Sequence, residues 1–373
     1  MEQIAISWLI LELTDSPFMV ALVGFSRMIP MFLFGFAAGS LADRFSKKRV
    51  MVAAQVVTLV TYSVMAAIFM GEAIRTWHAM LAIFITGTAF AADFAARRAF
   101  FSEILEEGKV ANAVSLDVAV LTGSQLVGPP VAGFLIHLVD FRGIFMVMLT
   151  AIAGALVLVS TVQVPQTALQ ASTRPTMLQQ LREAVTVIRR NDVVWAVVLV
   201  TICFNLVMGP FMQMVPVIAR DTLGADSTQY GILAGATGVG ALSGSLVIAT
   251  FAPQKQGTIF ALGALFACLG VLFFALSASY VVSLLIMLVI GLALSGFATM
   301  QIAMVLKSTP PELRGRAVGA VSLAIGSAPF GIILVGRLAE AFGPQTALAW
   351  TAVLGFTAIL ILWRRIPDLR DQR

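Results

Sequence analysis

Two acidic residues, Asp93 and Asp117, stand near one end of long apolar stretches. A carboxyl group at such a depth in a membrane can take up and release a proton. The alternative is a structural role, in which both carboxylates pair with Arg97 or Arg98 near the membrane surface. Both interpretations require these stretches to be helices that cross a bilayer.

A second pair of charges, Arg27 and Glu2, lies deeper. Arg27 is about ten residues into its stretch, which at about 1.5 Å per residue places it ~15 Å deep, near the middle of a bilayer. Glu2 falls at nearly the same depth on the preceding stretch. Because an unpaired charge is costly there, we predict an ion pair. It either lines a transport path, where Arg27 responds to substrate or proton movement, or is a buried structural pair.

The composition requires a membrane. Hydrophobic residues make up 59% of the chain and charged residues only 12%, about half of what a soluble domain carries. The net charge of +5 comes from basic residues in short loops, so membrane orientation explains it and nucleic acid is not an expected partner. Cys203 and Cys268 fall in apolar stretches and are expected to be small core residues.

Apolar runs of about 20 residues predict eleven complete membrane helices and one partial helix at 1–13, hence an all-α membrane protein. The complete helices are expected at 17–41, 50–70, 78–98, 112–138, 144–164, 193–218, 229–252, 258–277, 280–306, 317–338 and 344–363.

The distribution of basic residues predicts the topology. Of 24 Lys and Arg residues, 19 fall in alternate connections or the tail, which indicates the cytoplasmic side. Twelve helices with both ends in the cytoplasm satisfy this pattern. The first helix is about half the usual length, so we expect the natural protein to begin some 15 to 20 residues earlier.

The helices divide into two halves. We expect one bundle at 1–164, a cytoplasmic linker with an amphipathic helix at 165–192, and a second bundle with a basic tail at 193–373. The run AVSL occurs at 113–116 and again at 320–323, six predicted helices later, as a duplication would require.

Two motifs resemble the major facilitator superfamily. The segment GSLADRFSKKR at 39–49 resembles the loop between the second and third helices of that family, and GSQLVGPPVAG at 123–133 resembles a fifth-helix motif of its exporters. Other segments resemble the branch that contains macrolide and multidrug efflux proteins and the enterobactin exporter. The resemblance covers nearly the whole chain and implies two six-helix bundles.

The first motif implies a cytoplasmic gate made of Gly39, Asp43, Arg44, Lys47 and Lys48. An Asp can accept from the exposed N–H groups at the start of a neighbouring helix. The resemblance implies that this neighbour is the predicted helix at 317–338. The two lysines are also explained by the charge rule alone.

The second motif contains Gly123, Gly128, Pro129 and Gly133. Small residues at a spacing of five allow close packing, and a proline removes one backbone donor, so a packing or hinge role is expected. The resemblance implies that the partner is the helix at 229–252.

Candidates for a substrate cavity are weaker. Phe204, Asn205, Gln213 and Gln301 are polar or aromatic residues of the second half that fit such a role. Many antiporters of the family carry an Arg in the middle of the fourth helix, which is absent from 78–98.

The sequence contains no phosphate-binding Gly-rich loop, metal-ligand cluster or nucleophile triad, so no enzyme is expected. The resemblance implies a secondary transporter of the bacterial inner membrane that exports an amphipathic small molecule, such as a drug-like compound or siderophore, by proton antiport. No cofactor is expected, the partners are a small-molecule substrate and membrane lipids, and the chain is expected to be a monomer. A facilitator or importer, a lipid flippase and a transport-inactive sensor remain alternatives.

Overall fold

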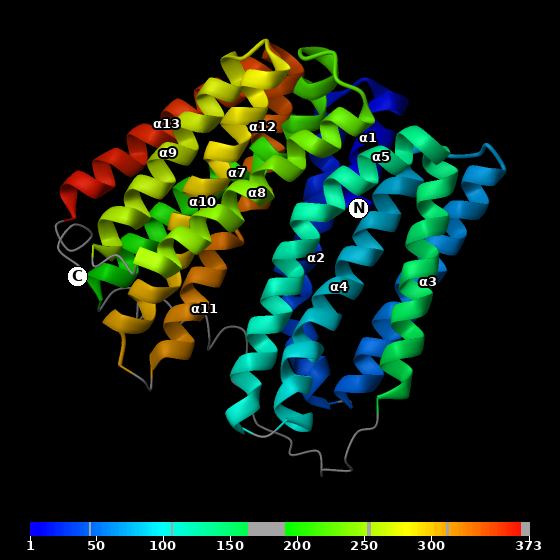
Figure 1. Ribbon diagram of the computed structural model, residues 1–373, viewed down its shortest axis with the longest axis horizontal. Coiled ribbons are helices and arrows are strands. Elements are labelled where there is room, and N and C mark those ends of the chain that lie inside the picture. The colour runs from blue at the N-terminus through cyan, green and yellow to red at the C-terminus, as the bar shows by residue number, and fades with distance from the viewer. Residues whose placement is uncertain (45, 106, 163–190, 252–254, 311–312, 367–373) are drawn as a thin grey trace. The chain divides into compact units, whose positions relative to one another are not determined.

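The computed structural model describes residues 1–44, 46–105, 107–162, 191–251, 255–310 and 313–366. Every regular element within these ranges is a helix, which confirms the predicted all-α class. The chain separates into two compact units (Figure 1). The first comprises Met1–Asp15 and Leu22–Arg174, and the second comprises Ser16–Ala21 and Pro175–Arg373. The amphipathic helix predicted in the linker lies outside the described residues.

The first unit is built mainly from five helical elements. Helix α3 packs against both α4 and α5, and α1 packs against α4 and α5. The elements are α1 (Glu2–Thr14), α2 (Pro17–Arg44), α3 (Lys47–Met70), α4 (Thr76–Ile104) and α5 (Glu107–Thr161).

Element α5 contains both helices predicted at 112–138 and 144–164, but the expected loop between them is a single non-helical residue, Asp140. Its φ of 60° and ψ of −178° interrupt the helix. Asp tolerates positive φ better than most residues, and here its Oδ1 accepts a hydrogen bond of 2.9 Å from the N–H of Phe141. The break therefore falls between the two predicted helices, although it is shorter than the interval 139–143 that separates them.

The described residues of the second unit form seven further helices. Helix α10 packs on α8 and α9, while α7 packs on α12 and α13. The helices are α7 (Asp192–Asp221), α8 (Ser227–Phe251), α9 (Gln256–Leu276), α10 (Tyr280–Ser308), α11 (Arg314–Ile325), α12 (Ala328–Phe342) and α13 (Pro344–Arg365).

The membrane-spanning stretch predicted at 317–338 is present at Arg316–Phe342, but it is interrupted, because α11 ends at Ile325 and α12 begins at Ala328. Pro329 lies in the first turn of α12. A proline has no N–H to donate and is tolerated at the start of a helix, so the chain breaks just before it.

The contact between α8 and α10 depends on glycine. A Cβ atom added at Gly240 would lie 2.0 Å from the carbonyl oxygen of Leu288, and one added at Gly291 would lie 2.0 Å from that of Thr237. No side chain fits at such distances. The two backbones therefore approach as closely as small residues allow between membrane helices.

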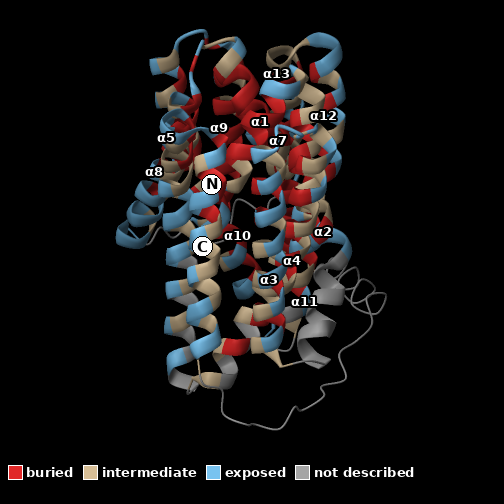
Figure 2. Ribbon diagram, turned by 90° about the vertical axis from the view of Figure 1, so that its right-hand side faces the viewer, coloured by how far each residue is buried: buried red, intermediate tan, exposed pale blue. Residues whose placement is uncertain are grey.

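Length and composition make these helices suitable for a bilayer. Within the described ranges, nine stretches are long and apolar enough to cross one, and the stretch Ala119–Thr161 holds 43 residues and includes the break at Asp140. Many residues along the helices are exposed (pale blue in Figure 2), and large apolar residues are among them. Examples are Val60, Leu158, Leu246 and Val281. Hydrocarbon is the solvent in which such exposure is favourable.

Candidate functional site: a charged cluster inside the first unit

The predicted ion pair between Arg27 and Glu2 is present. Nη1 of Arg27, on α2, lies 2.6 Å from Oε2 of Glu2, on α1. The other carboxylate oxygen of Glu2 accepts a hydrogen bond of 2.5 Å from the hydroxyl of Thr86, on α4. The Glu2 side chain is 10% exposed and that of Arg27 is 27% exposed. Three helices thus meet at one carboxylate.

Two aromatic side chains complete the cluster. The buried Tyr62 of α3 lies beside Glu2 and interacts with its carboxylate. The guanidinium carbon of Arg27 lies 5.6 Å from the ring centre of Phe90, within the range of a cation–π contact. We call Glu2, Arg27, Tyr62, Thr86 and Phe90 the Arg27 cluster.

Helices α2 and α4 approach closely at the level of the Arg27 cluster. A Cβ atom added at Gly87, next to Thr86 on α4, would lie 2.8 Å from the carbonyl oxygen of Arg27. Helices α2 and α4 therefore touch at the level of the ion pair. This contact places Thr86 and Arg27 on the same carboxylate.

The two charged groups of the Arg27 cluster differ in how much of their hydrogen-bonding capacity is used. Both oxygens of the Glu2 carboxylate accept a hydrogen bond, one from Arg27 and the other from Thr86. Arg27 uses only Nη1 in the hydrogen bonds found within the described residues. Its partial exposure leaves further N–H groups for an anion, a polar substrate or water.

Arg97 lies between the two predicted inner carboxylates. Its Nη1 is 3.3 Å from Oδ1 of Asp117, on α5, and its Nη2 contacts Oδ2 of Asp93, one turn earlier on α4. The side chains of Asp93 and Asp117 are only 13% and 7% exposed. Oδ1 of Asp93 is buried without a hydrogen-bond partner among the described residues. Two carboxylates thus share one guanidinium, while the side chain of Arg98 lies outside the described set.

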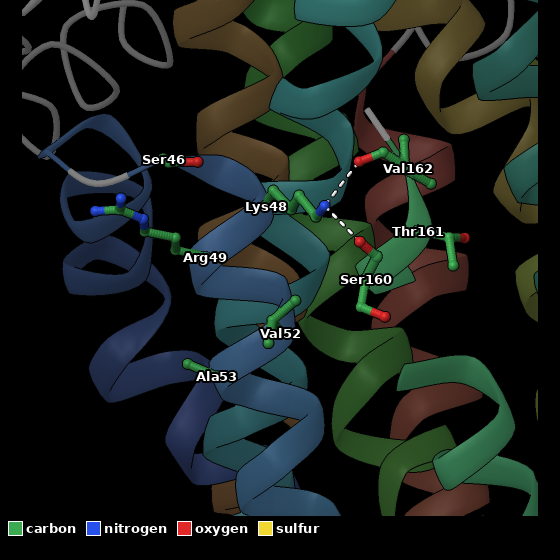
Figure 3. A pocket seen from close by; sticks show the side chains of 8 residues that line it. All are labelled: Ser46, Lys48, Arg49, Val52, Ala53, Ser160, Thr161 and Val162. Carbon is green, nitrogen blue, oxygen red and sulfur yellow. Dashed lines mark hydrogen bonds between the residues drawn. The ribbon is translucent and has the colours of Figure 1, made fainter. Parts of the chain in front are cut away.

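The predicted cytoplasmic gate is only partly described. Gly39, Asp43 and Arg44 lie in the last turns of α2, and their side chains fall outside the described residues. Nζ of Lys48 donates hydrogen bonds of 2.7 Å to the carbonyl oxygens of Ser160 and Val162 (Figure 3). Lys48 therefore satisfies carbonyl groups at the end of α5, as a cation at a helix C-terminus does.

Two glycines of the α5 motif, Gly123 and Gly128, make no tight contact with the described residues. A Cβ atom at Gly123 would meet no atom within 4 Å, and one at Gly128 would lie 3.6 Å from the nitrogen of Met1, an ordinary contact. Gly133 is buried, and the helix continues through Pro129. The hinge or packing role of these residues, and their pairing with α8, stay predictions.

The predicted cavity residues of the second unit form a hydrogen-bonded core. Nε2 of Gln301 donates 2.6 Å to the hydroxyl of Thr201, and Nδ2 of Asn205 donates 2.9 Å to the carbonyl oxygen of Thr201. The ring of Phe204 stacks on Phe297 at 3.8 Å between ring centres. Gln301 is 4% exposed and Phe204 3%, and Gln213 is also buried, so these three side chains lie inside the unit.

Sequence reasoning missed Tyr62, Thr86 and Thr201. Each is an uncharged polar residue in an apolar helix. Such residues are common in membrane helices and cost little, so no signal marked them. Thr86 does lie next to Gly87, and small residues often occur where membrane helices cross. That position is the feature of the sequence from which Thr86 could have been predicted.

Comparison with known proteins indicates one family. The model of the Major Facilitator Superfamily matches residues 3–331. Macrolide efflux protein A of Streptococcus pyogenes is 22% identical over 349 residues, which cover 91% of this chain and 85% of that protein. Macrolide efflux protein A of Enterococcus faecalis is 22% identical over 304 residues, or 80% and 92% of the two chains.

Solved structures share the fold at low identity. The nucleoside transporter NupG aligns with a TM-score of 0.70 at 16% identity, over 97% of this chain and 96% of that one. A bacterial homologue of the lysosomal transporter Spinster, in an inward-facing and unoccupied conformation, aligns with a TM-score of 0.73 at 13% identity over 99% and 95%. A D-xylose-proton symporter aligns with a TM-score of 0.69 at 17% identity over 99% and 90%.

Proposed function

The chain belongs to the major facilitator superfamily and is a multi-pass membrane transporter rather than an enzyme, and we propose that it exports an amphipathic small molecule by proton antiport. The similarity to macrolide efflux proteins over 91% of the chain supports export of a drug-like compound. The proposal includes a bacterial inner-membrane location with both termini in the cytoplasm and a monomer as the working unit, without a cofactor.

The Arg27 cluster is the observation that carries the mechanism. A charged pair at this depth is costly, and in membrane proteins such pairs usually border a substrate or ion path. A partly exposed guanidinium offers donors to an anionic or polar group of the substrate.

We expect a proton and Arg27 to compete for the carboxylate of Glu2, and this competition couples proton binding to substrate binding. When the Glu2 carboxylate takes up a proton, it loses its charge and therefore most of its attraction for Arg27. The guanidinium is then released toward substrate. When substrate leaves, Arg27 binds Glu2 again and favours loss of the proton. At the Arg27 cluster, proton binding and substrate binding thus favour each other, so the exchange of one for the other depends on a second acidic site.

The shared Arg97 is a second place for coupling. Asp93 and Asp117 face one guanidinium, so the described trio carries one negative charge more than it can pair internally. A proton bound there removes that excess. The buried and unpartnered Oδ1 of Asp93 is where such a proton would sit.

The deciding experiment measures direction and coupling together. Cells that express the protein are loaded with a panel of compounds that includes a macrolide, and efflux is followed with and without an uncoupler. We expect faster efflux of at least one amphipathic compound and loss of this effect when the proton gradient collapses. Efflux that survives the uncoupler would contradict antiport but not export.

Import is a second candidate, because one of the structures that share the fold is a proton symporter for D-xylose. The same assay separates the two functions. A compound that accumulates in expressing cells, and does so only with a proton gradient, would indicate symport. Binding of a compound without movement in either direction would indicate a transport-inactive sensor.

A further inference from the structure

Two cavities of the first unit meet at Arg49, on the first turn of α3. The first cavity, of about 820 Å³, lies where α3 begins and α5 ends (Figure 3). It is polar at its rim, where Ser46, Arg49, Ser160 and Thr161 line it. Because Lys and Arg favour the cytoplasmic side, this basic end of α3 corresponds to the cytoplasmic membrane surface.

The second cavity, of about 730 Å³, continues from the first along α3 and α4. Arg49 and Ala53 line both cavities. Apart from Arg49 and one threonine, all of its described lining is apolar. Its walls include Val57 on α3 and Phe84, Ile85, Ala89 and Ala92 on α4.

The two basic residues at the junction differ in their partners. Lys48 points toward α5 and is held by two carbonyl oxygens, whereas Arg49 points away from that side of α3 (Figure 3). Arg49 is exposed, and no hydrogen bond or ion pair joins it to any described residue. Among the residues that the structure describes, no group occupies the donors of Arg49, and its charge faces outward from α3.

We propose that the two cavities form one binding site for an anionic phospholipid of the cytoplasmic leaflet. The phosphate group binds Arg49, with the hydroxyl group of Ser46 at the same end of α3. One acyl chain follows the apolar cavity along α3 and α4. Charge and shape together specify this ligand, because a guanidinium selects a phosphate and an adjoining apolar groove selects a chain.

Lipid binding to the purified full-length protein tests the site. Native mass spectrometry would compare retention of phosphatidylglycerol with that of phosphatidylcholine of the same chain length. We expect preferential retention of phosphatidylglycerol. Arg49→Gln should weaken its binding roughly fivefold, since one basic side chain near an anionic surface contributes about 1 kcal/mol. The matched control is Arg365→Gln, which removes an exposed charge from the end of α13 in the second unit.

A second variant tests the acyl half independently. Ala53 is exposed and lines both cavities. The larger side chain of Ala53→Phe would therefore fill part of the space where the acyl chain binds, without disturbing the buried core of the unit. It should lower retention of phosphatidylglycerol while a thermal unfolding scan stays unchanged. Competition with glycerol 3-phosphate separates a lipid site from a site for soluble anions, and we expect no displacement at millimolar concentration.

Three results would overturn the proposal. They are equal retention of the two lipids, an equal effect of Arg49→Gln and Arg365→Gln, and displacement of the lipid by glycerol 3-phosphate. The last result would mean that the site recognises a phosphate alone.

Discussion

The hydroxyl of Ser16 donates a hydrogen bond of 2.9 Å to Oε2 of Glu340, a residue 324 positions later in the chain. The backbone N–H of Phe18 donates to the same oxygen at 3.2 Å, and the guanidinium of Arg337 lies 4.1 Å from the ring centre of Phe18. The first turn of α2 therefore belongs to the second unit, whereas the rest of α2 belongs to the first. A carboxylate at this place satisfies exposed N–H groups and the positive end of the α2 dipole.

Replacing Glu340 by Gln should loosen the start of α2. The neutral amide interacts less with the helix dipole, and the expected cost is about 0.3–1 kcal/mol for this exposed contact. Hydrogen exchange of the amides at 18–21 should become faster, because local opening needs less free energy. The control is Glu72→Gln, which removes a carboxylate that is 81% exposed and pairs with Arg142. Equal exchange rates in both variants would contradict a role for Glu340.

Arg27→Gln should reduce transport while the protein still folds. Loss of a hydrogen bond between charged groups is worth about 1.5–3 kcal/mol, which corresponds to roughly tenfold or more in a coupled equilibrium. Arg27→Lys keeps the charge and should retain part of the activity. The measurement is the initial rate of efflux normalised to protein in the membrane.

The control for Arg27 is Arg142→Gln, because Arg142 is 54% exposed and its ion pair lies at the surface. Normal efflux by Arg27→Gln would remove the Arg27 cluster from the mechanism. The double variant Glu2→Gln and Arg27→Gln should be more stable than either single variant, since it leaves no unpaired charge. A thermal unfolding scan in detergent measures this difference.

Gly291→Ala should destabilise the second unit. The added methyl group would lie 2.0 Å from the carbonyl oxygen of Thr237, so α8 and α10 must separate. Overpacking of this kind costs about 1–3 kcal/mol or more. The unfolding temperature in detergent should fall clearly. Gly154→Ala on α5 is the control, since a Cβ atom there meets nothing within 4 Å, and an equal fall in both variants would contradict the close crossing.

Features that depend on helix length and depth could be predicted from sequence. The helix expected at 280–306 is observed at Tyr280–Ser308, because apolar length and flanking polar residues determine where a membrane helix ends. The pair of Arg27 and Glu2 followed from their equal depth. The depth of a residue in the membrane can be calculated from its position in the helix and the rise per residue, which is the same in every α-helix.

Side-chain contacts that depend on how each helix is oriented about its own axis could not be predicted from the sequence. Thr86 and Tyr62 reach Glu2 only because of the way α3 and α4 turn their faces toward α1. That rotation is set by packing across several helices. The contact of Glu340 with Ser16 joins opposite ends of the sequence and carried no local signal. The break between α11 and α12 did carry one, in Pro329, and could have been predicted.

Asp93→Asn should uncouple transport from the proton gradient. In this variant Asp117 and Arg97 form a neutral pair, so the described trio has no excess negative charge and no reason to bind a proton. Efflux driven by a pH gradient should fall, while exchange of labelled for unlabelled substrate across the membrane should continue. The control is Asp221→Asn, since the Asp221 side chain is 42% exposed and pairs with its neighbour Arg220. Proton-driven efflux at the original rate in Asp93→Asn would exclude this trio as the coupling site. Glu2 would then be the other candidate carboxylate for proton coupling.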